Sequence, residues 1–249
     1  MLDFDIKVAG SSKHGAYGHQ SSKEIGCFGE DVFMSYRSKN GKYHYLAVAD
    51  GVGSWREDRI DPVEFPKALM EELKKIIEAL KEDEEKTCCD MIQEGYAILK
   101  AEHLNGNLHY GSCTFNFAKI NLLTGETEVA NIGDSALSIL KSCGSSHQTK
   151  IAQKGFNWPY QIGIEMRGPQ IYLDCKADTQ TYYFKLENGD KLISATDGVW
   201  DGMNFDQVNA EMKEPHSLES ICSNIYKKAR NWNRKTDDVT IILAQFKEI

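Results

Sequence analysis

The order of strand and helix patterns along this 249-residue chain predicts an α+β fold, a four-layer αββα sandwich of two antiparallel sheets flanked by helix pairs. Strands come first, then two helices, many strands, two more helices and a last strand, which differs from the strand–helix alternation of a parallel sheet. Turn signals such as Asn40-Gly41 connect neighbouring strands as hairpins. About ten strands and four helices can form two sheets that pack face to face with helices on their outer sides, which buries the apolar faces of the sheets and of the helices. We therefore expect a single domain over residues 1–249.

The periodicity of apolar residues locates each element. The turn at Asn188-Gly189-Asp190 further predicts that the strands on either side of it form a hairpin. The segment Gly10–Lys23 has no periodicity of apolar residues and is expected to be a loop that covers another part of the fold. The expected elements are strands over 32–36 and 43–50, a helix of about 15 residues with an apolar stripe from Leu69 to Leu80, a helix over 87–103, strands over 112–121, 126–132, 136–140, 149–153, 182–186 and 191–197, a short helix near 205–212, a helix with a stripe from Leu218 to Trp232, and a strand over 239–243.

The segment Lys154–Asp178 interrupts the strands and is expected to be an irregular excursion, or flap, of the kind that covers a site. It contains the aromatic residues Phe156, Trp158, Tyr160 and Tyr172. Two interpretations stay open. The aromatic side chains either seal the end of the sandwich core or receive the polypeptide that surrounds a substrate group.

Composition and charge limit the kinds of partner and the cellular compartment that we expect for this protein. The net charge of −8 and the pI near 5.4 leave no basic stripe for nucleic acid or an anionic membrane surface. No apolar run reaches the roughly 18 residues of a membrane span, and the first residues resemble neither a transit peptide nor a secretion signal. The seven cysteines are scattered without a C-x-x-C pair, which argues against structural zinc and favours free thiols in a reducing intracellular compartment, with the cytoplasm preferred. We expect a monomer.

Two aspartates follow apolar strands in the same local pattern. The apolar run Leu46–Ala49 is followed by Asp50-Gly51. In the segment LISATDGVW, a short apolar strand stops in the same way at Asp197-Gly198. A single Asp-Gly pair is more often a hairpin turn than a ligand, whereas its repetition favours a function. Carboxylates at the ends of rigid strands, beside glycines that allow close approach of backbone carbonyls, suit a hard divalent cation.

Further acidic residues begin or end other strands, and in a sandwich these ends can converge. No histidine or cysteine accompanies them, so an oxygen-only ligand set favours Mg2+ or Mn2+ over zinc. Clustered carboxylates repel one another unless a cation binds. Two cations about 3.5–4 Å apart can share a water, lower its pKa and clamp a phosphoryl oxygen. The set is Glu30, Asp31, Asp50, Asp134, Asp197, Asp201, Asp237 and Asp238.

The acidic residues belong to an ordered series of motifs that spans nearly the whole chain: Glu30-Asp31, Asp50-Gly51, Gly111-Ser112-Cys113-Thr114, Gly133-Asp134-Ser135, Asp197-Gly198-Val199-Trp200-Asp201 and Asp237-Asp238-Val239-Thr240. This series resembles that of a known family, the metal-dependent (PPM, type 2C) serine/threonine protein phosphatases. Within it, ADGVGSWREDRIDPVEF and FNWPYQI resemble the mitochondrial-type branch, so the resemblance also admits a mitochondrial location. It implies an αββα fold, two or three Mn2+ or Mg2+ ions, and hydrolysis of phosphoserine and phosphothreonine in a phosphoprotein by a water that bridges two ions, with no phosphoenzyme.

The resemblance also implies a role for each acidic residue. Some would bind the ions and others would orient the ligands. By this likeness Asp50 bridges both ions, Glu30 and the Gly51 carbonyl serve one, Asp197 and Asp237 hold the other, Asp134 and Asp201 help to bind a weaker third ion, Asp31 supports the ligands from behind, and Asp238 orients the final turn.

The chain departs from the family pattern at two positions. Val52 stands where many members have a histidine proposed as general acid, and Gly26 stands where many have an arginine that grips the phosphate. Lys23 and Arg56 are the nearest cations in sequence and are candidate phosphate-binding residues, although surface cations are more often simply solvated. His14 and His19 are candidate acids.

The two departures from the family pattern and the acidic residue set leave two other kinds of function open. A pseudophosphatase, a phosphoprotein-binding or regulatory module that keeps the fold without turnover, would explain Val52 and Gly26. A two-metal nuclease or small-molecule phosphatase would need a basic groove or a deep pocket, and the composition offers no basic groove.

Overall fold

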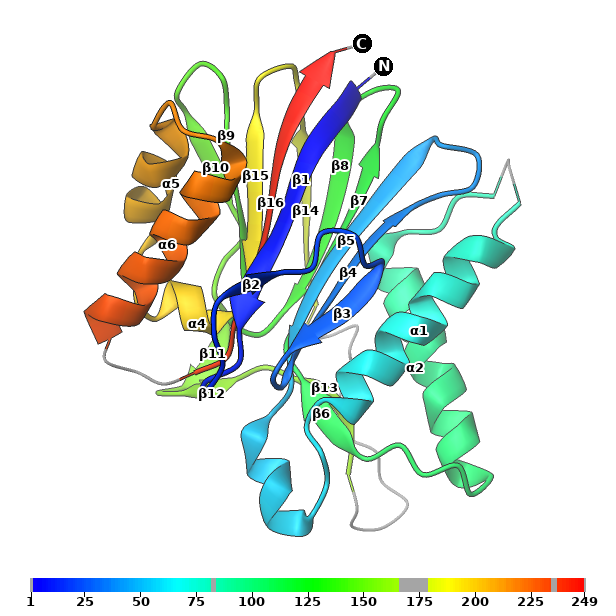
Figure 1. The fold of residues 1–249 in the computed structure, drawn as a ribbon. Helices are drawn as coiled ribbons and strands as arrows, with labels where there is room; N and C mark the ends of the chain where they lie inside the picture. Colours follow the sequence, from blue (N-terminus) through cyan, green and yellow to red (C-terminus); the bar gives the residue numbers. More distant parts are fainter. Residues whose placement is uncertain (1, 82–83, 166–178, 234–236, 249) are drawn as a thin grey trace.

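Two six-stranded antiparallel sheets face each other and carry helices on their outer sides, which confirms the expected four-layer sandwich (Figure 1). The structure is a computed structural model, and it describes residues 2–81, 84–165, 179–233 and 237–248. No helix in these described ranges is long and apolar enough to cross a membrane.

The first sheet contains the two longest strands, which are the first and last elements of the chain, and its outer face is covered by the C-terminal helices. Ile193 and Ile241 of the sheet pack with Ile221 and Ile225 of the longest of these helices. In sheet order the strands are β10 (Ser146–Gln148), β9 (Ala136–Leu140), β15 (Lys191–Ala195), β16 (Val239–Glu248), β1 (Leu2–Ser11) and β2 (Gly18–His19), and the helices are α4 (Asp197–Trp200), α5 (Phe205–Lys213) and α6 (Leu218–Asn233).

The second sheet is covered by two helices, as their apolar stripes predicted. Leu69, Leu73 and Ile76 of the first helix are buried against the sheet, and Thr87 caps the second helix by accepting the Asp90 N–H. In sheet order the strands are β14 (Gln180–Lys185), β8 (Glu126–Ile132), β7 (Phe115–Asn121), β5 (Tyr43–Asp50), β4 (Asp31–Arg37) and β3 (Ile25–Phe28), and the helices are α1 (Glu64–Ala79) and α2 (Cys88–Leu104).

A third apolar layer fills the space between the sheets. Successive residues of a strand point to opposite faces, so Leu46 and Val48 of β5 meet Ile242 of β16 in this layer. Ala47 and Ala49 of the same strand pack toward the helices instead. The strand that ends at Asp50 is therefore buried on both faces and holds its end rigidly.

Short elements gather at the end of the sandwich opposite to the chain termini (Figure 1). They lie where the strands that carry the acidic residues end. They are the 3-10 helix η1 (Gly53–Asp58), the two-stranded sheet of β6 (Gly111–Cys113) and β13 (Ile162–Ile164), and the hairpin of β11 (Gln153–Gly155) and β12 (Trp158–Pro159).

The N-terminal strand β1 has no counterpart among the expected elements. It pairs with β16 from Leu2↔Glu248 to Ser11↔Val239. Its sequence LDFDIKV alternates apolar and charged residues, which is a strand signal that sequence analysis missed. The expected loop over Gly10–Lys23 is accordingly wrong where β1 ends and where β2 forms.

The hairpin expected around Asn188-Gly189-Asp190 is wrong, because β14 pairs with β8 in one sheet and β15 pairs with β9 and β16 in the other. The reason lies in the buried Asp190. Its carboxylate accepts hydrogen bonds from Lys141 Nζ at 2.5 Å and from the Ser142 and Glu187 N–H groups at 2.8 Å. These bonds fix the turn against the first sheet, so the chain crosses from one sheet to the other.

The region 149–178 also differs from expectation. No strand spans 149–153, because β10 ends at Gln148 and Thr149 is buried, where its Oγ1 accepts the Leu137 N–H at 2.9 Å. The expected irregular flap is regular at β11, β12 and β13, and β13 pairs with β6. Residues 166–178, with Tyr172, lie outside the described residues.

Candidate functional site

The segments that carry the acidic motif residues lie at one end of the sandwich, opposite to the chain termini (Figure 1). Asp31 and Asp50 are direct partners across β4 and β5. Both sheets contribute residues, because strands of each sheet begin or end at this place. Glu30 and Asp31 lie at the β3–β4 turn, Asp50 ends β5, Asp134 lies between β8 and β9, Asp197 begins α4 directly after β15, and Asp237 and Asp238 precede β16.

The two Asp-Gly pairs are close backbone contacts rather than hairpin turns. A Cβ on Gly51 would lie 2.3 Å from the Pro62 carbonyl oxygen, and the Gly51 N–H donates to the Glu30 carbonyl at 3.2 Å. A Cβ on Gly198 would lie 2.0 Å from the Asp238 carbonyl oxygen. Glycine therefore brings Asp50 beside Glu30, and Asp197 beside Asp238.

Asp50 lies at the electrostatic centre of this cluster. Burial raises its pKa well above the ordinary range, and the negative charges of Asp197, Asp31, Asp237 and Asp134 raise it further. These oxygen-only donors, whose charges repel one another, fit a hard divalent cation. Among the described residues, however, no three acidic, histidine or cysteine groups already stand so that they could hold a metal ion.

Asp31 supports the cluster from behind. Its buried carboxylate accepts a hydrogen bond from Thr196 Oγ1 at 2.7 Å, and Thr196 Oγ1 accepts the Thr240 N–H at 3.1 Å. Burial raises the pKa of Asp31, the hydrogen bond from Thr196 opposes this, and the charges of Asp238 and Asp197 add to the rise. Through Thr196, Asp31 links β4 with the segments that precede α4 and follow Asp238.

Asp238 orients backbone at the same end of the molecule. Its carboxylate accepts the Glu30 N–H at 2.6 Å and the Lys13 N–H at 2.5 Å. Burial raises the pKa of Asp238, and these two hydrogen bonds lower it. Both carboxylate oxygens are thus engaged in holding the β3–β4 turn and the loop after β1.

Glu30 differs from its neighbours because two cations compensate its charge. Lys13 Nζ lies 2.9 Å from its Oε2, and Arg56 Nε lies 2.5 Å from its Oε1. Burial would raise the pKa of Glu30, but these ion pairs lower it below the ordinary range. Lys13 is not among the residues predicted for the site, because it lies in a segment without periodicity. Arg56, from η1, was a candidate phosphate-binding residue, and its guanidinium reaches the edge of the cluster.

The other candidate cation and acids lie apart from the cluster. Lys23 is exposed between β2 and β3, and within the described residues no ion pair or hydrogen bond joins its ammonium group to the acidic residues. His14 is exposed, and His19 Nε2 faces Glu219 at 3.8 Å. Position 26 has no room for a side chain, because a Cβ on Gly26 would lie 2.6 Å from the Phe33 ring.

Asp134 and Asp201 differ in burial and in their contacts. Asp134 is buried and accepts a hydrogen bond from Gln153 Nε2 at 2.8 Å, so the base of the β11–β12 hairpin touches the site. Asp201 is exposed at the end of α4, where its N–H donates to the Asp197 carbonyl at 2.8 Å.

The tip of the β11–β12 hairpin presents aromatic side chains to solvent. Phe156 is fully exposed and Trp158 is 62% exposed. Tyr160, in contrast, is partly buried against the layer under α1 and α2. The interpretation that these aromatics seal the core is therefore correct for Tyr160 and wrong for Phe156 and Trp158.

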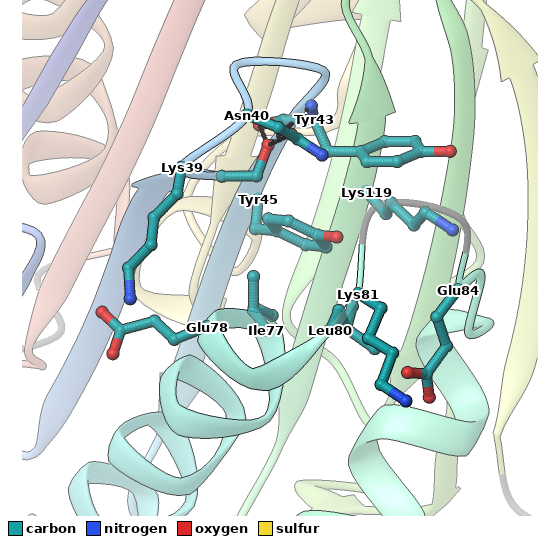
Figure 2. Close-up of a pocket in the computed structure, with 11 residues that line it drawn as sticks. Lys39, Asn40, Tyr43, Tyr45, Ile77, Glu78, Leu80, Lys81, Glu84 and Lys119 are labelled. Carbon is teal, nitrogen blue, oxygen red and sulfur yellow. Dashed lines mark hydrogen bonds between the residues drawn. The ribbon is translucent and has the colours of Figure 1, made fainter.

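A separate hollow of about 270 Å³ opens between the β4–β5 turn and the end of α1 (Figure 2). Tyr43 and Tyr45 line it together with Lys39, Lys119 and Glu78. It lies at the opposite end of β4 from Glu30 and Asp31, so it is not part of the acidic site.

Comparison with known proteins agrees with this geometry. A family model described as stage II sporulation protein E (SpoIIE) matches residues 66–247. The protein named "Protein phosphatase 2C homolog 7, mitochondrial", from Saccharomyces cerevisiae, is 32% identical over 199 residues, which cover 75% of this chain and 57% of the yeast protein. "Protein phosphatase PTC7 homolog" from Homo sapiens is 26% identical over 228 residues, 85% of this chain and 68% of that protein.

Solved structures resemble the fold. The photosystem II phosphatase PBCP superposes with a TM-score of 0.70 at 21% sequence identity, and the match covers 98% of each chain. The likeness therefore extends over the whole arrangement of sheets and helices.

Proposed function

Because the chain belongs to the SpoIIE/PP2C-type family of phosphatases, we propose that it is a metal-dependent protein phosphatase that hydrolyses phosphoserine and phosphothreonine in protein substrates. The observation that supports this proposal is the convergence of Asp50, Asp197 and Asp237 beside Glu30, with the resulting rise in the pKa of Asp50. The proposal treats residues 1–249 as one phosphatase domain, active as a monomer. Six free cysteines among the described residues fit a reducing compartment, and the name of the yeast relative makes mitochondria the first location to examine.

We assign two Mn2+ or Mg2+ ions to the cluster, with a weaker third. Bound ions would supply charge neutralisation for the phosphoryl oxygens and an activated water for in-line attack. Asp50 would serve both ions, Glu30 and the Gly51 carbonyl one of them, Asp197 and Asp237 the other, and Asp134 and Asp201 the third ion.

The remaining residues of the site orient these ligands. Asp31 keeps its carboxylate toward Thr196, and Asp238 holds the backbone of Glu30. Val52, which follows Asp50-Gly51, donates its N–H to the Ser112 carbonyl at 3.0 Å and has no acidic proton to give to a leaving group. Arg56 is the better supported of the two proposed phosphate-binding cations, because it contacts Glu30, whereas Lys23 has no such contact among the described residues.

The exposed tip of the β11–β12 hairpin is the proposed contact for the polypeptide around the phosphorylated residue. Gln153 at its base donates to Asp134, and Phe156 and Trp158 at its tip are exposed. A peptide whose phosphate lies at the cluster can then touch these aromatic side chains, as is usual for exposed aromatics in recognition surfaces.

The alternative is a pseudophosphatase that binds phosphoproteins without turnover. One observation favours it: both oxygens of Glu30 are paired with Lys13 and Arg56, so this carboxylate is engaged before any metal binds. The alternative requires these ion pairs to persist in the presence of millimolar Mn2+.

Hydrolysis of p-nitrophenyl phosphate separates the two functions. We expect wild-type turnover that requires Mn2+ or Mg2+, and a fall to a few per cent or less in Asp50→Ala with an unchanged circular dichroism spectrum. Wild-type protein that shows no turnover above buffer with any of these ions, at micromolar concentration, would support the pseudophosphatase. Wild-type turnover retained by Asp50→Ala would refute the ligand assignment.

A further inference from the structure

Lys13 enters the acidic site from the loop after β1, which is held in place by contacts with distant parts of the chain. Its backbone N–H donates to Asp238 Oδ1 at 2.5 Å. The preceding residue, Ser12, accepts a hydrogen bond from the Arg230 guanidinium through its carbonyl at 3.0 Å, and Ser11 Oγ accepts a second at 2.7 Å. Residues of strand β1, helix α6 and the segment before β16 thus fix the backbone from which the Lys13 side chain extends.

Within the described part of the chain, the partners of the Lys13 ammonium group are acidic. It lies 2.9 Å from Glu30 Oε2, and its side chain is 33% exposed. The charges of Asp238 and Asp237 also act on it. Arg56 approaches the other oxygen of Glu30 from η1 and is 57% exposed. Two cations from different elements therefore flank one carboxylate at the rim of the site, and both retain contact with solvent.

We propose that Lys13 is a phosphate-binding residue of this site, acting beside Arg56 on the anionic group of the substrate. This inference rests on the proposed phosphatase function. Two divalent cations at the cluster would bring four positive charges close to Lys13 and Arg56, and like charges at such short range repel. A phosphomonoester dianion between them offsets this repulsion, and the partly exposed ammonium group needs only a side-chain rotation to donate to it.

Calorimetric titration of inorganic phosphate into the Mg2+-loaded protein tests this role without turnover. Lys13→Met should weaken phosphate binding roughly tenfold, the size expected for one charge-assisted hydrogen bond. The KM for p-nitrophenyl phosphate should rise by a similar factor, with a smaller change in kcat. Lys13→Arg keeps the charge and should bind phosphate within a few-fold of wild type.

Lys247→Met is the matched control. Lys247 forms an ion pair with Asp5 at the far end of β16, so the variant also removes a lysine–carboxylate pair, but away from the site. It should leave phosphate affinity, KM and kcat at wild-type values.

Two outcomes would overturn the inference, and a third would overturn only the proposed phosphatase function. Unchanged phosphate affinity in Lys13→Met, with only Mg2+ affinity altered, would make Lys13 a counter-ion of Glu30. Equal losses in Lys13→Arg and Lys13→Met, with lowered melting temperatures, would make the loop contact structural. Lys13-dependent phosphate binding in a wild-type protein that hydrolyses nothing would refute the proposed phosphatase function and leave the assignment of Lys13 intact.

Discussion

Stability should fall on mild acidification because of a single buried histidine, His44 of β5. Its imidazole packs edge-on against the Phe4 ring at 4.5 Å, and its Nε2 shares a hydrogen bond of 3.0 Å with Ser35 Oγ. Its Nδ1 is buried and has no hydrogen-bond partner among the described residues. Burial, with a smaller effect of the positive charge of Arg37, lowers the pKa of His44 to about 3.

The sign and size of the effect follow from this pKa. The unfolded chain binds a proton at the ordinary pKa of about 6.5, whereas the folded protein keeps His44 neutral down to about pH 3. The stability that neutral His44 contributes is complete above pH 6.5 and is lost as the pH falls from 6.5 toward 3. Between pH 7.5 and pH 5 the loss is about 2 kcal/mol, and any folded pKa below about 4 gives the same loss at pH 5.

The assay compares the free energy of unfolding in urea for wild type and His44→Gln at pH 7.5 and pH 5. Other groups also titrate, and the raised pKa values of Asp31 and Asp50 act in the opposite direction, so the difference between the two proteins is the measured quantity. The advantage of wild type over the variant should shrink by about 2 kcal/mol at the lower pH. His147→Gln, at an exposed position on β10, should follow wild type.

Parallel profiles for wild type and His44→Gln, within about 0.5 kcal/mol, would refute the reasoning, because the imidazole would then titrate alike in the folded and unfolded chains.

Three further predictions concern the site. Asp197→Asn should abolish turnover of p-nitrophenyl phosphate yet melt at the same or a higher temperature in EDTA, because Asp197 raises the pKa of Asp50; a lower melting temperature in EDTA would contradict this repulsion. Mn2+ at a hundredfold excess over its Kd should stabilise the folded wild type by about 2.7 kcal/mol relative to EDTA. A melting temperature that changes neither with Mn2+ nor with EDTA would argue against a metal site. Trp158→Ala should lower phosphopeptide turnover several-fold and leave p-nitrophenyl phosphate hydrolysis and the melting temperature unchanged, with Tyr183→Ala, at another exposed aromatic residue, as the control. Equal losses on both substrates together with a lower melting temperature would show that Trp158 serves only to pack the hairpin.

Local patterns predicted that acidic residues gather where strands end, because each of these residues stands within a few residues of an apolar run. An apolar run that stops at Asp50-Gly51 or Asp197-Gly198 identifies a strand end, and antiparallel sheets bring such ends to common edges. The same kind of signal failed at Asn188-Gly189-Asp190. A turn sequence determines that the chain bends, but the buried hydrogen bonds of Asp190 decide which sheet the next strand joins.

Strand β1 was missed for a related reason. Its apolar residues alternate with Asp3, Asp5 and Lys7, so its overall polarity is that of a loop, and only its period of two indicates a strand. The pairing with β16 at the opposite end of the sequence supplies the apolar neighbours that justify this alternation.

The cations of the site were harder to predict than its carboxylates, and the difference is physical. A metal-binding carboxylate must stand on rigid backbone, so it lies at a strand end and leaves a local pattern. A lysine reaches its target through a long flexible side chain, and its position depends on where its loop is fixed. For Lys13 those fixed points are Asp238 and Arg230, more than two hundred residues later in the sequence. Lys23 is closer to Glu30 in sequence than Lys13 is, yet only Lys13 contacts it, because tertiary contacts and not sequence distance determine which ammonium group faces the acidic site.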